Sequence, residues 1–248
     1  MKFHAITDVG RMRSQNQDNV YGTTQPIGAL PDLFLVADGM GGHNAGDYAS
    51  RRALELVRDS AASSDQEEPV RVLRDAITEA NQILYREASD TRERSGMGTT
   101  FVAAVVTDEN LLVANVGDSR LYVLHDGKLR QVTLDHSLVE EMVRTGSMSQ
   151  EVAYHHPKKH MITRAVGAEE TIEIDFFDVP LTGDEIILMC TDGLSNMVED
   201  DRICDLLLAE GTIEQRAESL VQAANQKGGS DNITVIVIEP FSSEVKAC

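Results

Sequence analysis

The chain is organised around residues 33–46, LFLVADGMGGHNAG, an unbroken apolar run that ends in Asp38 and continues into glycines. Apolar runs of this length form buried strands, and glycine-rich segments break them. Such a strand brings one carboxylate to the edge of the core, beside backbone too small to crowd it, which suits a hard cation. Asp38 is therefore the first candidate metal ligand. Asp-Gly is also a common turn dipeptide, so this stretch alone leaves both interpretations open.

The composition is that of an acidic globular protein. A length of 248 residues fits one large domain or two small ones, and 42% hydrophobic residues are enough to build a core. The formal net charge of −19 argues against a nucleic-acid partner and makes an acidic cation site more plausible. No apolar run is long enough to span a membrane and the N-terminus has no signal-peptide core, so we expect a cytoplasmic protein without a membrane partner. Three cysteines without metal-binding spacing predict no disulfide framework.

The hydrophobic pattern predicts helices separated by groups of strands. The predicted helices are 48–60, 70–87, a short helix opened by Ser137 and closed by Gly146, and 212–226. Besides the strand before Asp38, the predicted strands are 2–8, 19–25, 99–107, 110–116, 120–125, 171–179, 185–190 and 233–238. Residues 147–168 have no clean period and are rich in cationic and histidine side chains, which predicts an excursion over the surface.

Four aspartates lie beside glycine or serine at predicted strand boundaries: Asp38, Asp118, Asp192 and Asp231. A single such residue is typical of a turn, but four form a candidate cluster. If the strands are neighbours in two packed sheets, the carboxylates converge at one end and repel one another unless cations neutralise them. Ligands that offer only oxygen favour Mg²⁺ or Mn²⁺ over zinc.

These motifs, in their order along the chain, resemble those of the protein phosphatase 2C family, the metal-dependent serine/threonine phosphatases, and most closely the compact bacterial type. The matching segments are Arg13 with residues 16–19 (NQDN), 38–43 (DGMGGH), 98–100 (GTT), 117–120 (GDSR), 191–193 (TDG) and 229–232 (GSDN). Each segment is a weak signal alone, but the combination is specific.

The resemblance implies an α+β fold, an αββα sandwich of two packed mixed or antiparallel sheets flanked by helices. The whole chain, residues 1–248, would form a single phosphatase domain with a flap at about residues 146–167 that borders the substrate cleft. Asp118 would share a third, weaker metal site with Asp192.

By position, the resemblance also implies a centre of two Mn²⁺ or Mg²⁺ ions. Asp38 would bridge both ions, the Gly39 carbonyl would join one of them, and Asp192 and Asp231 would complete the other. Phosphoserine and phosphothreonine monoesters would be hydrolysed by direct attack of a metal-bridging water or hydroxide.

The resemblance implies two further roles. Arg13 matches the phosphate-binding arginine of the family, and Asp18 matches the acid that orients the attacking water. The proton donor stays open, because animal members have a histidine where this chain has Met40. His43, His160 or a water remain the candidates.

The expected partners are phosphoproteins, including a bacterial serine/threonine kinase and its substrates, and we expect a monomer. Two other functions remain open at this stage. A carboxylate site with two metals also suits a phosphodiesterase or nuclease, although the chain lacks a basic face. A phosphoprotein-binding module without turnover is the second alternative.

Overall fold

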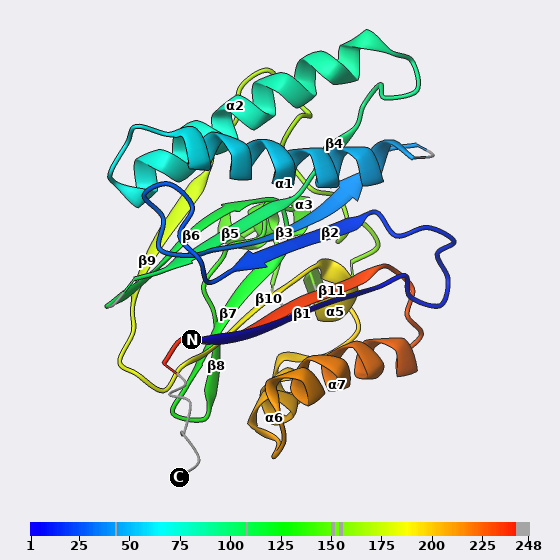
Figure 1. The fold of residues 1–248 in the computed structure, drawn as a ribbon. Helices are drawn as coiled ribbons and strands as arrows, with labels where there is room; N and C mark the ends of the chain where they lie inside the picture. The colour runs from blue at the N-terminus through cyan, green and yellow to red at the C-terminus, as the bar shows by residue number, and fades with distance from the viewer. Residues whose placement is uncertain (43, 108, 150–151, 154–155, 242–248) are drawn as a thin grey trace.

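The protein folds as two β-sheets packed face to face between two layers of helices (Figure 1). The structure is a computed structural model that describes residues 1–42, 44–107, 109–149, 152–153 and 156–241. Every strand pair in the two sheets is antiparallel, so the sheets are antiparallel and not mixed. The predicted α+β sandwich is confirmed.

The first sheet has five strands. In spatial order they are β1 (Lys2–Asp8), β11 (Ile233–Glu239), β10 (Ile186–Cys190), β7 (Arg120–His125) and β8 (Lys128–Gln131). Its outer face is covered by α6 (Asp200–Leu208) and α7 (Ile213–Gln226). Thr212 caps α7 through a capping box with Gln215, as its Thr-x-x-Gln sequence predicts.

The second sheet has six strands. In spatial order they are β2 (Asp18–Thr23), β3 (Leu33–Met40), β5 (Phe101–Val106), β6 (Asn110–Val116) and β9 (Asp175–Pro180), and β4 (Gly98–Thr99) pairs with the end of β3. Its outer face is covered by α1 (Ala45–Ser63) and α2 (Pro69–Asp90), which lie side by side (Figure 1).

The central strands are rich in apolar residues because both of their faces are buried. In β3, Leu33, Leu35 and Ala37 belong to the core under α1 and α2. Phe34 and Val36 belong to the core between the sheets. Side chains alternate along a strand, so Asp38 continues the inter-sheet row and ends it with a carboxylate.

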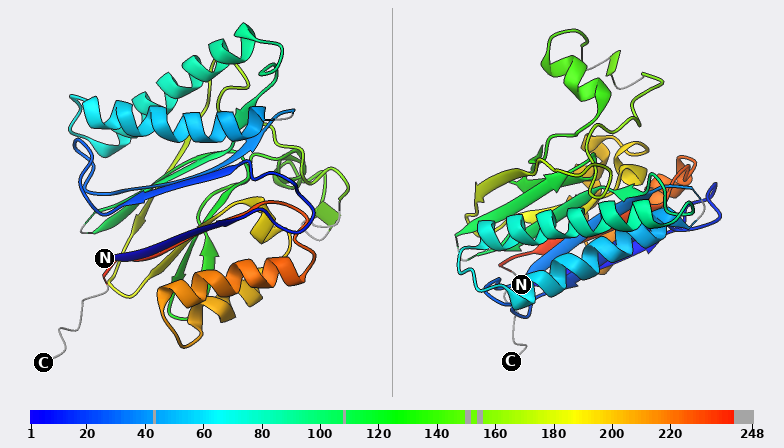
Figure 2. Two further views of the ribbon diagram at one scale, coloured as in Figure 1. Left: turned by 45° about the vertical axis from the view of Figure 1, so that its right-hand side comes forward. Right: turned by 90° about the horizontal axis from the view of Figure 1, so that it is seen from above.

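The segment after β8 projects from one end of the sandwich. It contains the short helix α3 (Leu138–Arg144), whose Ser137 hydroxyl accepts a hydrogen bond from the Glu140 amide, and it stands clear of both sheets in the right-hand view of Figure 2. This is the region of the predicted flap. No helix within the described ranges is both long and apolar enough to cross a membrane.

Several predicted boundaries were wrong. The strand predicted at 171–179 is strand only from Asp175, because its pairing with β6 begins there, opposite Asn115. The strand predicted at 19–25 ends at Thr23, and the one predicted at 99–107 is divided between β4 and β5. Both long helices extend beyond the predicted 48–60 and 70–87. Strand β8 and the helices α5 (Asp192–Ser195) and α6 were not predicted.

Candidate metal centre

The inter-sheet layer ends in a cluster of buried polar side chains. Asp18 on β2 lies opposite Asp38 on β3 in the strand register. One carboxylate oxygen of Asp18, Oδ2, accepts hydrogen bonds from the hydroxyls of Thr191 and Thr234, both at 2.8 Å. Its other oxygen, Oδ1, is buried without a hydrogen-bond partner. An unpaired buried carboxylate oxygen is costly, so this atom calls for a ligand or an ordered water.

The backbone of Asp38 is held on both sides. The Asp38 amide donates to the Thr100 hydroxyl (2.9 Å), and the Asp38 carbonyl accepts from the Thr100 amide and the Thr99 hydroxyl (both 2.9 Å). The next residue, Gly39, packs so closely on Gly46 that a Cβ on Gly39 would overlap the Gly46 carbonyl. Gly39 therefore belongs to a close backbone approach inside β3 and not to a turn, which removes the turn interpretation of this dipeptide.

The other three aspartates reach the same end from different elements. Asp118 follows Gly117 in the β6–β7 connection. Asp192 is the first residue of α5, and its Oδ2 accepts a hydrogen bond from the Asn196 amide group at 2.8 Å. Asp231 precedes β11.

One cavity of about 500 Å³ contains these groups. It is lined by Arg13, Gln17, Asp38, Gly39, Met40, Gly41, Thr100, Asp118, His160, Ile162, Asp192, Ser230, Asp231 and Asn232. The structure thus brings together seven of the nine residues singled out in the sequence. Asp18 lies buried beside Asp38, outside the cavity wall, and His43 lies outside the described residues.

Burial and mutual repulsion make the carboxylates costly to ionise without cations. Burial raises the pKa of Asp38 well above its usual range, and the neighbouring Asp18 and Asp192 raise it further. Burial also raises the pKa of Asp118, with Asp192 as the next cause. The pKa of Asp18 rises to about 7, chiefly through burial, although its two threonine hydrogen bonds oppose the shift.

The donor set fits divalent cations that prefer oxygen. Asp192 Oδ1, like Asp18 Oδ1, is buried without a hydrogen-bond partner. Four carboxylates and the Gly39 backbone line one space, and neither cysteine that the structure describes lies in it. Such ligands select Mg²⁺, Mn²⁺ or Ca²⁺.

Arg13 stands at the rim of the cavity. Its side chain is 50% exposed, and its guanidinium Nη2 lies 2.8 Å from Asp231 Oδ2. The loop that holds it is fixed by Asn232, whose Oδ1 accepts from the Gln17 amide and whose Nδ2 donates to the Val9 and Gln15 carbonyls. Asn232 is a site residue that was not predicted, although its place in the GSDN segment was a signal that it belongs to the site.

His160, in the segment of the predicted flap, faces Asp192. Its Nδ1 lies 3.7 Å from Asp192 Oδ2, and the His160 side chain is 58% exposed. A solvent-accessible imidazole at the mouth of the cavity can exchange protons with groups bound inside it.

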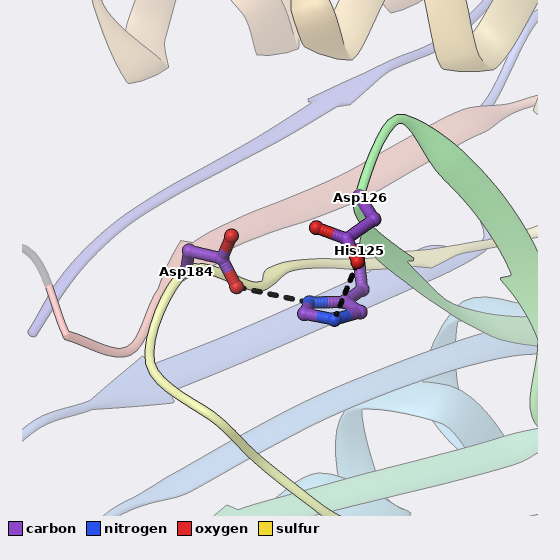
Figure 3. Close-up of side chains that lie close together, drawn as sticks. All are labelled: His125, Asp126 and Asp184. Atoms are coloured by element: carbon purple, nitrogen blue, oxygen red, sulfur yellow. Dashed lines mark ion pairs between the residues drawn. The ribbon is translucent and has the colours of Figure 1, made fainter.

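A second cluster lies at the opposite end of β7 and consists of His125, Asp126 and Asp184 (Figure 3). Here Nδ1 of His125 lies 2.9 Å from Asp184 and Nε2 lies 3.4 Å from Asp126. Both ring nitrogens face carboxylates, and the side chains of Asp126 and Asp184 are 79% and 67% exposed, so the group lies open to solvent. We therefore assign no metal to this cluster.

Comparisons with known proteins agree with this geometry. The family model for "Protein phosphatase 2C" matches residues 11–233, and the chain belongs to the protein phosphatase 2C family. It is 43% identical to the serine/threonine phosphatase stp of Listeria monocytogenes over 237 residues, which cover 94% of this chain and 93% of that protein.

Solved structures give the same result. The crystal structure of the serine/threonine phosphatase Stp1 from Staphylococcus aureus matches with a TM-score of 0.88 and 35% identity, over 95% of this chain and 93% of that one. The catalytic domain of the serine/threonine protein phosphatase PstP, in complex with two manganese ions, matches with a TM-score of 0.83 and 30% identity, over 95% and 96% of the two chains.

Proposed function

We propose that this chain is a metal-dependent protein serine/threonine phosphatase that hydrolyses phosphoserine and phosphothreonine monoesters by direct attack of water. The observation that carries the proposal is the single cavity in which four aspartates, the Gly39 backbone and Arg13 converge. Membership of the protein phosphatase 2C family supports it.

In this proposal, Asp38 and the Gly39 carbonyl would hold two Mn²⁺ or Mg²⁺ ions together with Asp192 and Asp231, and Asp118 would share a weaker third ion with Asp192. Bound divalent ions lower the pKa of water and offset the negative charge on the phosphoryl oxygens. The two manganese ions of the similar PstP domain support the choice of Mn²⁺.

The chain's own side chains supply orientation. Arg13 can reach the phosphate because it is half exposed at the rim, and its planar guanidinium can bind two phosphoryl oxygens at once. Asp18 lies behind the cavity wall, opposite Asp38 in the strand register, and its buried Oδ1 has no partner. In this proposal it would orient the attacking water from that side.

We propose His160 as the proton donor to the leaving oxygen. The alkoxide of serine is strongly basic and needs a proton, whereas an aryl oxide leaves without one. His160→Gln should therefore slow a phosphoserine peptide by roughly tenfold to a hundredfold and an aryl phosphate by less than about threefold. Equal losses on both substrates would exclude this role and leave His43 or a water as the donor.

The central experiment compares three substrates with Mn²⁺ and with a chelator. A chromogenic phosphate monoester and a phosphoserine peptide should be hydrolysed only with the metal, and a bis-ester should be hydrolysed much more slowly. Preference for the bis-ester would favour the phosphodiesterase alternative, and Mn²⁺ binding without turnover would favour the binding module. The module is disfavoured because the cavity contains the complete set of Arg13, Asp38, Asp192 and Asp231.

Four expectations from the sequence stay predictions. They are the bacterial serine/threonine kinase as counterpart, the monomeric state, the cytoplasmic location, and the assignment of residues 1–248 to a single phosphatase domain with a flap at 146–167.

A further inference from the structure

His136 holds both polar backbone groups of Gly117, the residue before Asp118. The His136 amide donates to the Gly117 carbonyl at 2.9 Å, and its ring Nδ1 accepts from the Gly117 amide at 3.1 Å. Gly117 has a φ of +106°, and a Cβ there would lie 2.7 Å from the Thr100 side chain. The turn that presents Asp118 is thus tightly packed. The Gly117 carbonyl also accepts from the Asn115 side chain at 3.4 Å, whereas the Gly117 amide donates to the His136 ring.

The other ring nitrogen is held from the flap side. Because Nδ1 accepts a hydrogen bond, the proton of the neutral imidazole lies on Nε2, which donates to Asp175 Oδ2 at 3.1 Å. Asp175 Oδ1 in turn accepts from Arg164 Nη1 at 3.0 Å. His136 is only 6% exposed, and burial lowers its pKa, which keeps the ring neutral.

The same residues tie down the base of the flap. The Thr163 amide donates to the His136 carbonyl at 2.8 Å, and the Leu138 amide donates to the Met161 carbonyl at 2.9 Å. A few residues on, Val166 exchanges two backbone hydrogen bonds with Thr99, at 2.8 and 3.0 Å. Since Thr99 also donates to the Asp38 carbonyl, the flap base is joined to the segments of two candidate ligands.

We propose that His136 is a positioning residue that fixes the Gly117–Asp118 turn, and with it the cation site at Asp118, while Asp175 on β9 and Arg164 in the flap hold its ring. The inference rests on the proposed function, because it assumes that Asp118 binds a divalent ion. Residues that orient metal ligands typically contribute roughly tenfold to a hundredfold in metal affinity.

Two substitutions of His136 test the contribution of each ring nitrogen separately. His136→Asn keeps an acceptor near the Nδ1 position, facing Gly117, whereas His136→Gln keeps a donor near Nε2, facing Asp175. The step to follow is binding of the weaker third Mn²⁺ ion, which in the proposed function depends on Asp118. We expect His136→Gln to weaken this Asp118-dependent step by roughly tenfold. His136→Asn should stay within about threefold of the wild type in that step. The measurement is titration calorimetry with Mn²⁺, alongside the Mn²⁺ concentration that half-saturates hydrolysis of an aryl phosphate.

The matched control is Asp32→Ala. Asp32 is 3% exposed and accepts a hydrogen bond from the Val106 amide at 2.8 Å, so its loss also leaves a buried amide without a partner. It lies beside the start of β3, at the opposite end of that strand from Asp38. Asp32→Ala should lower the melting temperature and leave Mn²⁺ affinity unchanged.

The outcomes are distinct. Unchanged Mn²⁺ binding in His136→Gln, or equal weakening in both histidine variants, overturns the inference. If neither variant folds, Asp175→Ala replaces them. The Asp175 side chain is 34% exposed, and its loss frees the His136 ring together with the Arg164 guanidinium that Asp175 binds. Asp175→Ala should weaken the same step by about threefold, and no change overturns the inference. Wild-type protein that binds Mn²⁺ without hydrolysing any phosphate monoester would instead refute the proposed function, and calorimetry would still decide the role of His136.

Discussion

Among single residues, Asp38 is a carboxylate that the chain itself does not neutralise. Its backbone is fully hydrogen-bonded, yet its side chain faces other carboxylates, and burial raises its pKa well above the usual range. Asp38→Asn removes the charge and keeps the shape, so the metal-free variant should be at least as stable as the wild type. Hydrolysis should fall by more than about a hundredfold, because in the proposed function Asp38 would hold both ions.

Asp192→Asn should lose activity in the same way. Calorimetry with and without Mn²⁺ tests both variants, and each should lose most of the metal-induced rise in melting temperature. Asp178→Asn, on an exposed position of β9, is the control and should behave as wild type. The ligand assignment is wrong if either centre variant keeps full activity and the full metal-induced rise.

Arg13 supports a prediction on substrate binding. It is half exposed and contacts Asp231 across a rim-exposed ion pair, which contributes little to stability. Arg13→Ala should therefore raise KM for a phosphopeptide by roughly tenfold and lower kcat by less than about threefold. Steady-state kinetics at saturating Mn²⁺ measures both.

Arg11→Ala is the matched control for Arg13. It lies in the same loop, but its guanidinium donates to the Asn225 carbonyl and does not line the cavity. An unchanged KM in Arg13→Ala, or the same rise in both variants, would remove Arg13 from the phosphate site.

At the scale of elements, the sequence predicted the strands well where both faces are buried and less well elsewhere. Strand β6, which is buried from Leu111 to Val116, and strand β7 both have the predicted limits. By contrast, β8 is a four-residue edge strand with a single apolar residue, Leu129, and α5 is too short to show a helical period. The unpredicted α6 did carry a signal, since its buried Ile203, Leu206 and Leu207 have helical spacing.

The same dipeptide has different uses in different elements, which limits what any one motif can predict. Asp126-Gly127 is a hairpin turn in which both residues have positive φ, +49° and +71°. Asp38-Gly39 lies inside β3, and Asp192-Gly193 begins α5. The candidate site was predictable from the ordered set of motifs, whereas Asn232 and His136 act through hydrogen bonds between segments distant in sequence.

The segment of the predicted flap supports a prediction about substrate selection at the scale of elements. Lys158 is exposed, and Lys159 beside it is half-buried, in the segment that precedes His160. Replacing both by Glu should slow dephosphorylation of acidic phosphopeptides and blunt its dependence on salt, because a basic rim acts through screened attraction. An aryl phosphate, which has no flanking residues, should be hydrolysed within about twofold of the wild-type rate.

Lys128→Glu is the control for charge alone, because Lys128 is exposed on β8, on the hairpin next to His125 and away from the cavity. Equal losses on peptide and aryl phosphate would mean that the segment supports the metal centre. No loss on either would mean that its cations take no part in substrate selection.

At the scale of the whole molecule, an acidic chain with a net charge of −19 concentrates buried carboxylates at one end of its sandwich. Without metal, folding there requires either protonated aspartates or unfavourable buried charges. Bound cations neutralise these carboxylates, so neither protonation nor unfavourable buried charge is needed. Metal binding and folding stability should therefore be linked, and the link should depend on pH.

The direction of the pKa shifts determines whether the stability of the metal-free protein rises or falls with pH. Asp18, with a pKa raised to about 7, and Asp38 and Asp118, with pKa values also raised, bind more protons folded than unfolded. Below the pKa values of the unfolded chain, near 4, these groups contribute their full stabilisation to the folded state. That stabilisation is lost as the pH rises through the pKa values of the folded state. Asp32, whose pKa burial raises to about 6, acts in the same direction, while the lowered pKa of His136 opposes them as a single group.

We therefore expect the melting temperature of the chelated protein to fall between pH 5 and pH 8. A loss on the order of 2 kcal/mol would lower it by roughly 4–8 °C in a domain of this size. Saturating Mn²⁺ should raise the melting temperature more at pH 8 than at pH 5, because the ions replace protons that the carboxylates have released. Asp38→Asn should flatten the fall in chelator, whereas Asp178→Asn should leave it unchanged. Scanning calorimetry across this pH range decides the matter: a melting temperature that rises with pH in chelator, or a Mn²⁺ effect of equal size at both ends, would mean that cations do not neutralise this cluster.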